Sequence, residues 1–289
     1  MKIQYLICLL IIINPGPAYG YKYLSEIGES SWARTGSRFM CRLEHKISAY
    51  GEGQFRHEAG EAQELLLLGD GYQYAPKPVS VVSELPNWRP RGLPKTLAEI
   101  LVLDGELRVT GDLVKELLSE LTQGNLVAFK SVLKETNNEP MDVYLSSVGL
   151  KAAYENYKRC EANLLSANYR QLERSRIQYA SGTHEIPSSG KQLLDKMAEF
   201  LLEDPSVVQI FIDGHTDDVG FKKANVSISE KRAIEVTNYL LTLSISPDKI
   251  VTRFHGERYP VVKNNSAKGK AKNRRTTIRL SREKKQADP

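Results

Sequence analysis

Residues 212–233 read IDGHTDDVGFKKANVSISEKRA, and they decide how the C-terminal part of the chain folds. The apolar run VVQIFID (207–213), which overlaps their start, predicts a strand, and the polar run after Ile212 predicts a loop. Ser227 and Glu230 have the spacing of a capping box, so we expect a helix to begin at Ser227. The stretch therefore predicts a strand, a polar loop and a helix.

The segments on either side continue this alternation of strands and helices. A helix is expected after the capping-box pattern at Ser189 to Gln192, where apolar residues follow at helical spacing. Further strands are expected at RSRIQYA (174–180), KIVTRFHG (249–256) and RTTIRL (275–280). This β-α-β-α-β-β order predicts a sheet covered on one face by helices.

The chain before about residue 165 has a different pattern, with many short strands and few helices. Alternating or apolar runs predict strands within 37–51, 61–71, 79–85, 99–111, 125–134 and 141–148, with a hairpin turn at Asp104-Gly105. A helix is expected over 111–124, ending at Gly124, and a second helix over 148–165. The fold class is therefore α+β, with a barrel-like or sandwich-like β-rich N-terminal domain. Two domains are expected, because these two regions exceed one ordinary core.

The polar loop and the following helix carry opposite charges at Asp217 and Arg232. With the helix starting at Ser227, Arg232 lies near its N-terminus, where the helix dipole disfavours a cation unless an anion is bound there. An opposed carboxylate and guanidinium fit a zwitterion such as the head of an amino acid, through charge-assisted hydrogen bonds. An internal salt bridge that fixes the loop fits the same spacing equally well.

The first twenty residues have the order of a secretory signal peptide. Lys2 precedes the apolar run YLICLLIII (5–13), and Ala18-Tyr19-Gly20 supplies small residues for cleavage. The run is shorter than the ~20 residues of a membrane-spanning helix. We therefore expect cleavage, a mature chain that begins near Tyr21 and has no transmembrane segment, and export from the cytoplasm. An uncleaved anchor is the alternative.

The mature chain then keeps two cysteines, Cys41 and Cys160, because Cys8 leaves with the signal peptide. Two cysteines in an exported protein usually pair, so we expect a disulfide between them. Two buried free thiols are the alternative.

The expected export of the protein argues against nucleic-acid binding, and the spacing of its polar residues argues against a catalytic metal site. Lys263–Lys285 contains ten Lys or Arg residues and one acid, but an exported protein meets lipid headgroups and wall carboxylates rather than nucleic acid. The polar residues that could be imagined as metal ligands lack the helical spacing of a zinc motif; they are His215, Asp217, Asp218, His255 and Glu257. We expect no enzyme activity, no metal and no cofactor.

The loop and helix resemble the OmpA-like peptidoglycan-binding domain, whose pattern runs T-D-x-x-G and then Y-N-x-x-L-S-x-x-R-A. This chain has TDDVG at 216–220, ANVSISEKRA at 224–233, and a further matching stretch, NSAKGKAKNRR, at 265–275. The resemblance implies that Asp217 and Arg232 hold the diaminopimelate of the stem peptide. It implies that the same pocket is lined by Thr216, Asn225 and Ile228. Ala224 and Ile228 depart from the family's Tyr and Leu, and Asn273, Arg274 and Arg275 are expected to order the last loop and strand.

The whole layout is similar to the MotY family, periplasmic components of the flagellar motor, most closely at MCRLEHKISAYGEGQFRHEAG (40–60). The resemblance implies that residues 21–160 attach to the basal body in the T ring. They are then expected to help recruit or hold stator units with a MotX-like partner, while residues 161–289 bind the wall. A general envelope tether unrelated to motility fits the wall-binding motif equally well.

Overall fold

The structure is a computed structural model that describes residues 20–71, 74–75, 77–90, 92–102, 106–132 and 139–283. The predicted signal peptide, apart from Gly20, and the predicted turn at Asp104-Gly105 lie outside the described residues. No helix in the described part is long and apolar enough to cross a membrane.

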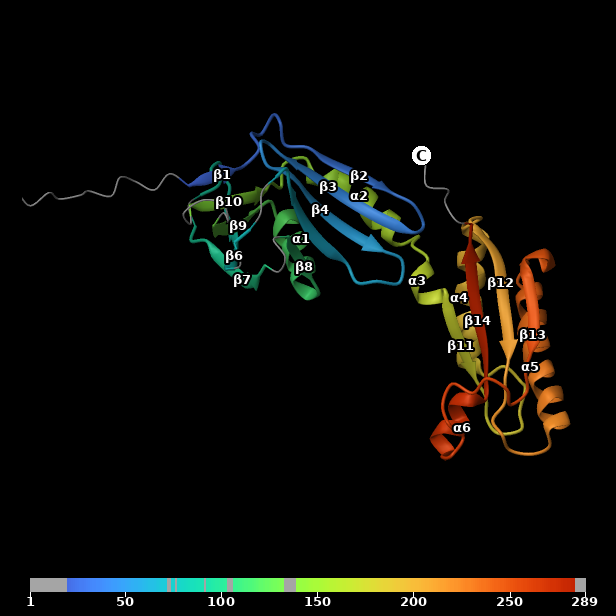
Figure 1. Cartoon of the computed structure of the whole chain (residues 1–289). Coiled ribbons are helices and arrows are strands. Elements are labelled where there is room, and N and C mark those ends of the chain that lie inside the picture. The colour runs from blue at the N-terminus through green and yellow to red at the C-terminus, as the bar shows by residue number, and fades with distance from the viewer. Residues whose placement is uncertain are drawn as a thin grey trace, which may run out of the picture. The chain divides into compact units, whose positions relative to one another are not determined.

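The chain divides into two compact units (Figure 1), which we describe separately. Among the described residues, the first unit contains 20–35, 42–56 and 63–158. The second unit contains 159–283 together with two short pieces of the N-terminal region, 36–41 and 57–62.

The strands of the N-terminal region form two five-stranded sheets. One has the order β1 (Tyr21–Tyr23), β10 (Pro140–Leu145), β9 (Leu126–Val132), β6 (Pro78–Glu84) and β7 (Lys95–Leu101). The other has the order β2 (Trp32–Gly36), β3 (Met40–Ile47), β4 (Gly51–Glu58), β5 (Glu64–Gly69) and β8 (Leu107–Thr110). Alternation in β3 buries every second side chain, and these are Cys41, Leu43, His45 and Ile47.

The expectation of a barrel-like domain is wrong, because neither sheet closes within the described residues. β1 and β7 are the edges of one sheet, and β2 and β8 are the edges of the other. The alternation of apolar residues predicts only that each strand has one buried face, and an open sheet satisfies that pattern as well as a closed one.

Two helices accompany these sheets, α1 (Asp112–Thr122) and α2 (Leu150–Glu161). The helical spacing predicted for α1 is confirmed, since Val114, Leu117, Leu118 and Leu121 are buried on one face. Gly124 follows the helix with a φ of 88°, a conformation that favours glycine and ends a helix.

The second unit has one four-stranded sheet in the order β11 (Arg174–Gln178), β14 (Arg275–Arg282), β12 (Val207–Gly214) and β13 (Ile250–Phe254). The helices are α3 (Tyr169–Leu172), α4 (Ser188–Glu203), α5 (Lys222–Thr242), the 3₁₀ turn η1 (Pro247–Lys249) and α6 (Ala267–Asn273). Figure 1 shows α4 and α5 on the same side of the sheet, as the β-α-β-α-β-β order predicts.

The predicted start of the helix after the polar loop is wrong by five residues. α5 begins at Lys222, Phe221 is its N-cap, and no side chain caps it. Ser227 therefore lies inside α5, and Arg232 lies near its middle rather than at its N-terminus. The spacing of a capping box also occurs inside helices. The second expected box, at Ser189, likewise falls one residue inside α4 and makes no cap bond.

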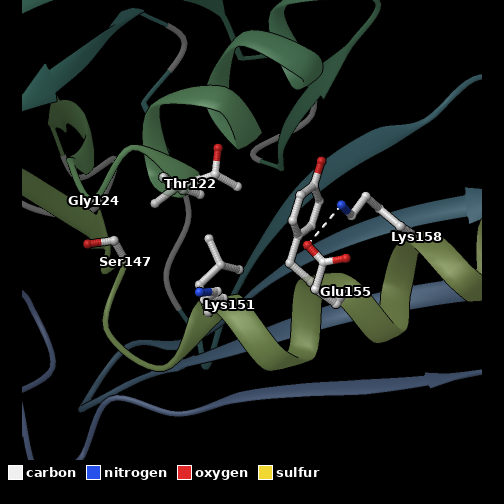
Figure 2. Close-up of a pocket in the computed structure, with 9 residues that line it drawn as sticks. Thr122, Gly124, Ser147, Lys151, Glu155 and Lys158 are labelled. Carbon is white, nitrogen blue, oxygen red and sulfur yellow. Dashed lines mark ion pairs between the residues drawn. The ribbon is translucent and has the colours of Figure 1, made fainter.

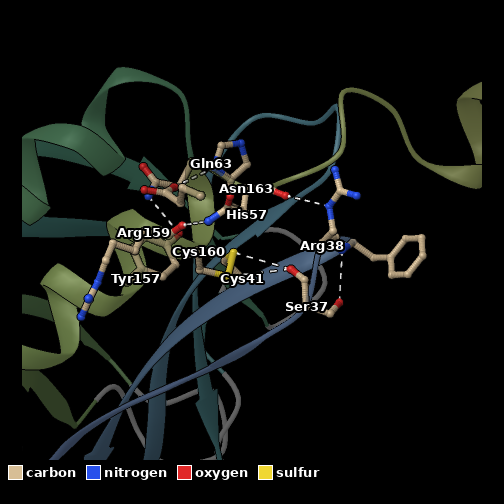
Figure 3. Close-up of a disulfide and its surroundings, with 11 residues drawn as sticks. Ser37, Arg38, Cys41, His57, Gln63, Tyr157, Arg159, Cys160 and Asn163 are labelled. Carbon is tan, nitrogen blue, oxygen red and sulfur yellow. Dashed lines mark hydrogen bonds and ion pairs between the residues drawn. A yellow bond between two sulfur atoms is a disulfide. The ribbon is translucent and has the colours of Figure 1, made fainter. Parts of the chain in front are cut away.

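The predicted disulfide is confirmed: Cys41 of β3 is bonded to Cys160 of α2 (Figure 3), with Cα atoms 5.9 Å apart. Both cysteines belong to the second unit. Beside them, the Nδ1 atom of His57 lies 2.6 Å from Oε1 of Glu161. The backbone N–H of Leu165 donates to the carbonyl oxygen of Arg38 at 2.8 Å. The disulfide thus joins the piece 36–41 to the last turn of α2, and the His57 contact joins the piece 57–62 to the same turn.

These pieces also contribute to the hydrophobic core of the second unit. Ala59 is fully buried in the same cluster as Phe200 of α4. Phe39 packs edge-on against the Phe200 ring, with ring centroids 5.7 Å apart. The core of this unit therefore includes residues that lie more than a hundred positions earlier in the sequence.

We predict that Cys41→Ser lowers the free energy of unfolding by about 4–5 kcal/mol in the chain-entropy model, because the bond closes a loop of 119 residues. The measurement is thermal melting of the full chain with and without reductant. Reductant should lower the melting temperature of the wild type toward that of the variant and leave the variant unchanged. A wild-type melting curve that is the same in both conditions contradicts the prediction.

Candidate functional site

The polar loop after β12 is held in place by main-chain bonds to two neighbouring segments. The N–H of His215 donates to the carbonyl of Arg275, and the N–H of Thr216 donates to the carbonyl of Gly256, both at 2.8 Å. Gly214 ends β12 directly against the Ser229 carbonyl of α5, and a Cβ atom at this position would overlap that oxygen. Glycine therefore lets the strand approach α5 closely, which brings the loop onto the helix.

Asp217 is 4% exposed and forms an ion pair inside the protein. Its Oδ2 accepts from Nη1 of Arg274 at 2.8 Å. Its Oδ1 accepts only a long bond of 3.4 Å from the N–H of Val219. Arg274 is itself fixed, because its Nε donates to the Tyr179 carbonyl at 3.1 Å. The internal salt bridge left open by the sequence is therefore present, but its cation is Arg274 and not Arg232.

Arg232 is 1% exposed and binds backbone carbonyls rather than a carboxylate. Its guanidinium donates to the carbonyls of Thr183 and His215, both at 2.8 Å, and to that of Ala180 at 3.4 Å. The group also lies over the Tyr179 ring, 4.6 Å from its centroid. Burial lowers the pKa of Arg232 to about 10, so the side chain is still charged at neutral pH.

Arg232 does not lie at the N-terminus of α5, because α5 begins at Lys222, so the helix dipole does not disfavour its charge there. What the structure does provide is spare hydrogen-bonding capacity. A guanidinium has five N–H groups, and the described residues use three of them in the bonds to Ala180, Thr183 and His215. Two N–H groups remain for a ligand.

The other three predicted residues lie on the same loop and the same helix. Asn225 is 3% exposed and its amide donates to Oε2 of Glu257 at 3.0 Å, while Ile228 is half-buried. The Oγ1 atom of Thr216 is buried and has no hydrogen-bond partner in the described part of the chain. A buried hydroxyl without a partner is costly, so a ligand or water that bonds to it is favoured.

The second matching stretch orders the neighbouring loop, as expected. The side chain of Asn273, which is fully buried, accepts from the N–H of Val261 at 2.9 Å and donates to the carbonyl of Val262 at 2.7 Å. Arg275 donates to the carbonyl of Tyr259 at 3.0 Å. The sequence pattern did not identify Arg274 as the partner of Asp217, although Arg274 is part of the NRR stretch (273–275).

The two histidines near this loop are packed against each other. The rings of His215 and His255 stack with centroids 4.9 Å apart, and burial lowers the pKa of His215 to about 4. His255 also hydrogen-bonds Asp213 at 2.8 Å. Within the described residues, no group of three or more His, Cys, Asp or Glu side chains is arranged to hold a metal ion.

The first unit has a cavity of about 460 Å³ between the end of α1 and the side of α2 (Figure 2). Its lining includes Lys151, Tyr154 and Lys158 of α2. The Lys158 ammonium pairs with Glu155 at 2.9 Å and lies 5.2 Å from the centroid of the Tyr154 ring. This cavity was not expected from the sequence, because the residues that line it on α2 have the ordinary spacing of a helix face.

Comparison with known families finds two matches along the chain. Residues 23–166 match the MotY N-terminal domain, and residues 178–274 match the OmpA family. The chain belongs to the family that joins a MotY N-terminal domain to an OmpA-family domain.

Individual relatives agree with this assignment. The chain is 26% identical to the sodium-type flagellar protein MotY of Vibrio parahaemolyticus over 94% of both chains. It is 35% identical to outer membrane protein A of Bordetella avium over 33% of this chain and 48% of that protein. It is 34% identical to the peptidoglycan-associated lipoprotein of Buchnera aphidicola over 35% of this chain and 58% of that protein. The resemblance to the flagellar protein covers nearly the whole chain, whereas each of the other two covers about a third of it.

We predict that Arg232→Ala lowers the free energy of unfolding by about 3 kcal/mol or more, because it removes three hydrogen bonds made by a buried guanidinium, one of them to the buried carbonyl of His215. Lys231→Ala, at an exposed neighbouring position on the same helix, should change it by less than about 0.5 kcal/mol. Both values come from chemical denaturation of the full chain. Equal stability of the two variants would show that Arg232 does not organise the loop.

Proposed function

We propose that this protein is a non-enzymatic, periplasmic component of the bacterial flagellar motor. In this proposal it is exported by a cleaved signal peptide of residues 1–20. Residues 21–160 attach to the basal body in the T ring, where they help to recruit or anchor stator units together with a MotX-like partner. Residues 161–289 bind peptidoglycan. The observation that carries the proposal is the similarity to a flagellar MotY protein over 94% of both chains.

The geometry of the second unit supports recognition of a zwitterion such as the end of diaminopimelate. Oδ1 of Asp217 has spare acceptor capacity for an ammonium group. The two remaining N–H groups of Arg232 can receive a carboxylate, and the Thr216 hydroxyl can supply a further bond. Charge-assisted bonds to both ends of one ligand give affinity and orientation together.

The ion pair with Arg274 favours binding of the ligand's ammonium group, because it orients the Asp217 carboxylate before the ligand binds. Asn225 and Ile228 complete the proposed pocket on the α5 side. Asn225 is itself oriented by Glu257 of the neighbouring loop. A site whose groups are held by the fold loses less conformational entropy on binding.

We predict that Asp217→Asn weakens co-sedimentation of the full chain with purified peptidoglycan sacculi by about tenfold or more, because the buried charge pair between Asp217 and the ammonium group of the ligand is lost. Asp218→Asn is the matched control: it is the adjacent carboxylate, its side chain is 50% exposed, and it should sediment like the wild type. Thermal melting of each variant reports whether it is folded. A folded Asp217→Asn chain that sediments as well as the control removes the site assignment.

Attachment to the motor is tested separately, by co-purification with hook-basal bodies after enzymatic digestion of the peptidoglycan. We predict that the wild type and Asp217→Asn both remain with the basal bodies, because residues 21–160 make that attachment. Release of the wild type with the wall fragments would instead favour a general envelope tether unrelated to motility.

A further inference from the structure

One face of the sheet in the second unit is not covered by the helices. α4 and α5 both pack against the other face (Figure 1), where the core side chains Ile210, Ile212, Ile278 and Leu280 lie. Residues that are paired directly across neighbouring strands lie on the same face, and the faces alternate along each strand. The pairing register therefore gives the composition of the uncovered face.

Two adjacent rows of side chains cross this face. The first row, from β11 to β13, is Arg174, Arg279, Phe211 and Val251. The second row, two residues along each strand, is Arg176, Thr277, Asp213 and Arg253. Four arginines thus surround a small centre of aromatic and polar side chains. We call these eight residues the arginine face.

The arginine face is open to solvent and hollowed at the β11 side. Arg174, Arg176 and Arg279 are exposed, and together with Asp213 and Thr277 they line a shallow cavity of about 440 Å³. At the centre of the face, two guanidinium groups lie over one aromatic ring. The Phe211 ring has the guanidinium of Arg279 at 4.4 Å and that of Arg253 at 5.1 Å from its centroid.

The positive charge of this face is not balanced by its own acid. Asp213 accepts from Nε and Nη2 of Arg253 at 2.7 and 2.8 Å, and it also bonds His255. Among the described residues, no carboxylate lies within ion-pair distance of the other three guanidinium groups. Three exposed arginines therefore remain available to a partner.

We propose that the arginine face is a docking surface for the acidic surface of a partner protein. Unpaired guanidinium groups attract carboxylates, and a planar guanidinium group can bind a carboxylate through two parallel hydrogen bonds. This surface involves residues different from those of the wall-binding site, so it goes beyond the proposed function and does not depend on it.

A protein partner fits this surface better than a lipid or glycan polyanion. The four strands contain six Arg and no Lys, although Lys is abundant in nearby segments such as 263–272. Arginine and aromatic residues are enriched at protein interfaces, where lysine is depleted, whereas general attraction to polyanions does not distinguish the two cations. The Phe211 ring between two arginines supplies the desolvated centre that such interfaces use.

The test is site-specific photo-crosslinking of the full chain in the cells that produce it. A benzophenone amino acid is placed at Gln209 or Gln178, which are exposed at the two ends of the face, or at Lys196 on α4 as the background position. We expect a protein adduct from the first two positions and not from the third. Mass spectrometry should locate it at a segment rich in Asp and Glu.

Charge reversal then decides whether the arginines make the contact. Arg174→Glu with Arg279→Glu should reduce the adduct about tenfold or more. Lys196→Glu with Lys231→Glu makes the same charge change on the helices and should leave it unchanged. Arginine substitutions in the partner's acidic segment should restore the adduct of the Arg174→Glu, Arg279→Glu variant. Neither of the two double variants should change co-sedimentation with sacculi.

Three results would overturn the proposal. The first is an adduct whose mass is that of a phospholipid or a glycan, which assigns the face to an envelope polyanion. The second is a protein adduct that survives reversal of Arg174 and Arg279. The third is crosslinking at both Gln209 and Gln178 that does not exceed the Lys196 background, which would make the face a solvated surface.

Discussion

The buried guanidinium of Arg232 is the interaction on which the candidate site depends. A charge that is 1% exposed is destabilising unless its hydrogen bonds are made inside the protein. Here the carbonyls of Ala180 and Thr183 come from the segment before α4, and that of His215 comes from the loop after β12. The Arg232 side chain of α5 therefore fixes the segment before α4 and the loop after β12 relative to each other. Asp217, two residues beyond His215, takes its position from the same arrangement.

The sequence predicted the residue types of this site but not how its charges are paired. The sequence pairs Asp217 with Arg232, whereas the fold brings two cations, Arg232 and Arg274, near this carboxylate. Which of them forms the ion pair depends on the path of the last loop, and that path is set by Asn273 through contacts with Val261 and Val262. The start of α5 was misplaced for a similar reason, because an S-x-x-E spacing does not distinguish a helix terminus from a helix interior.

The organisation of the N-terminal region was predictable in part. Alternation of apolar residues located the strands and the spacing of leucines located α1, because both patterns follow from burial of one face. The cysteine pairing followed from the expected compartment of the protein. By contrast, Phe39 and Ala59 look like ordinary residues of a strand and a turn. Only their contacts in the core of the second unit assign them to it.

The second unit has two different surfaces, the arginine face and the buried site around Asp217, and strand β12 leads to both. Asp213 faces the arginine face, whereas the residues from His215 to Asp217 continue into the buried site. A small zwitterion is best bound by groups that are desolvated and held in advance, since each bond must offset a large share of the ordering entropy. A protein–protein interface distributes this entropy cost over many contacts, and exposed charges increase the rate at which the two proteins associate. Within the described part of the chain, Arg174 and Arg279 make no bond to the loop of Asp217, so substitutions in the two surfaces should act independently of each other.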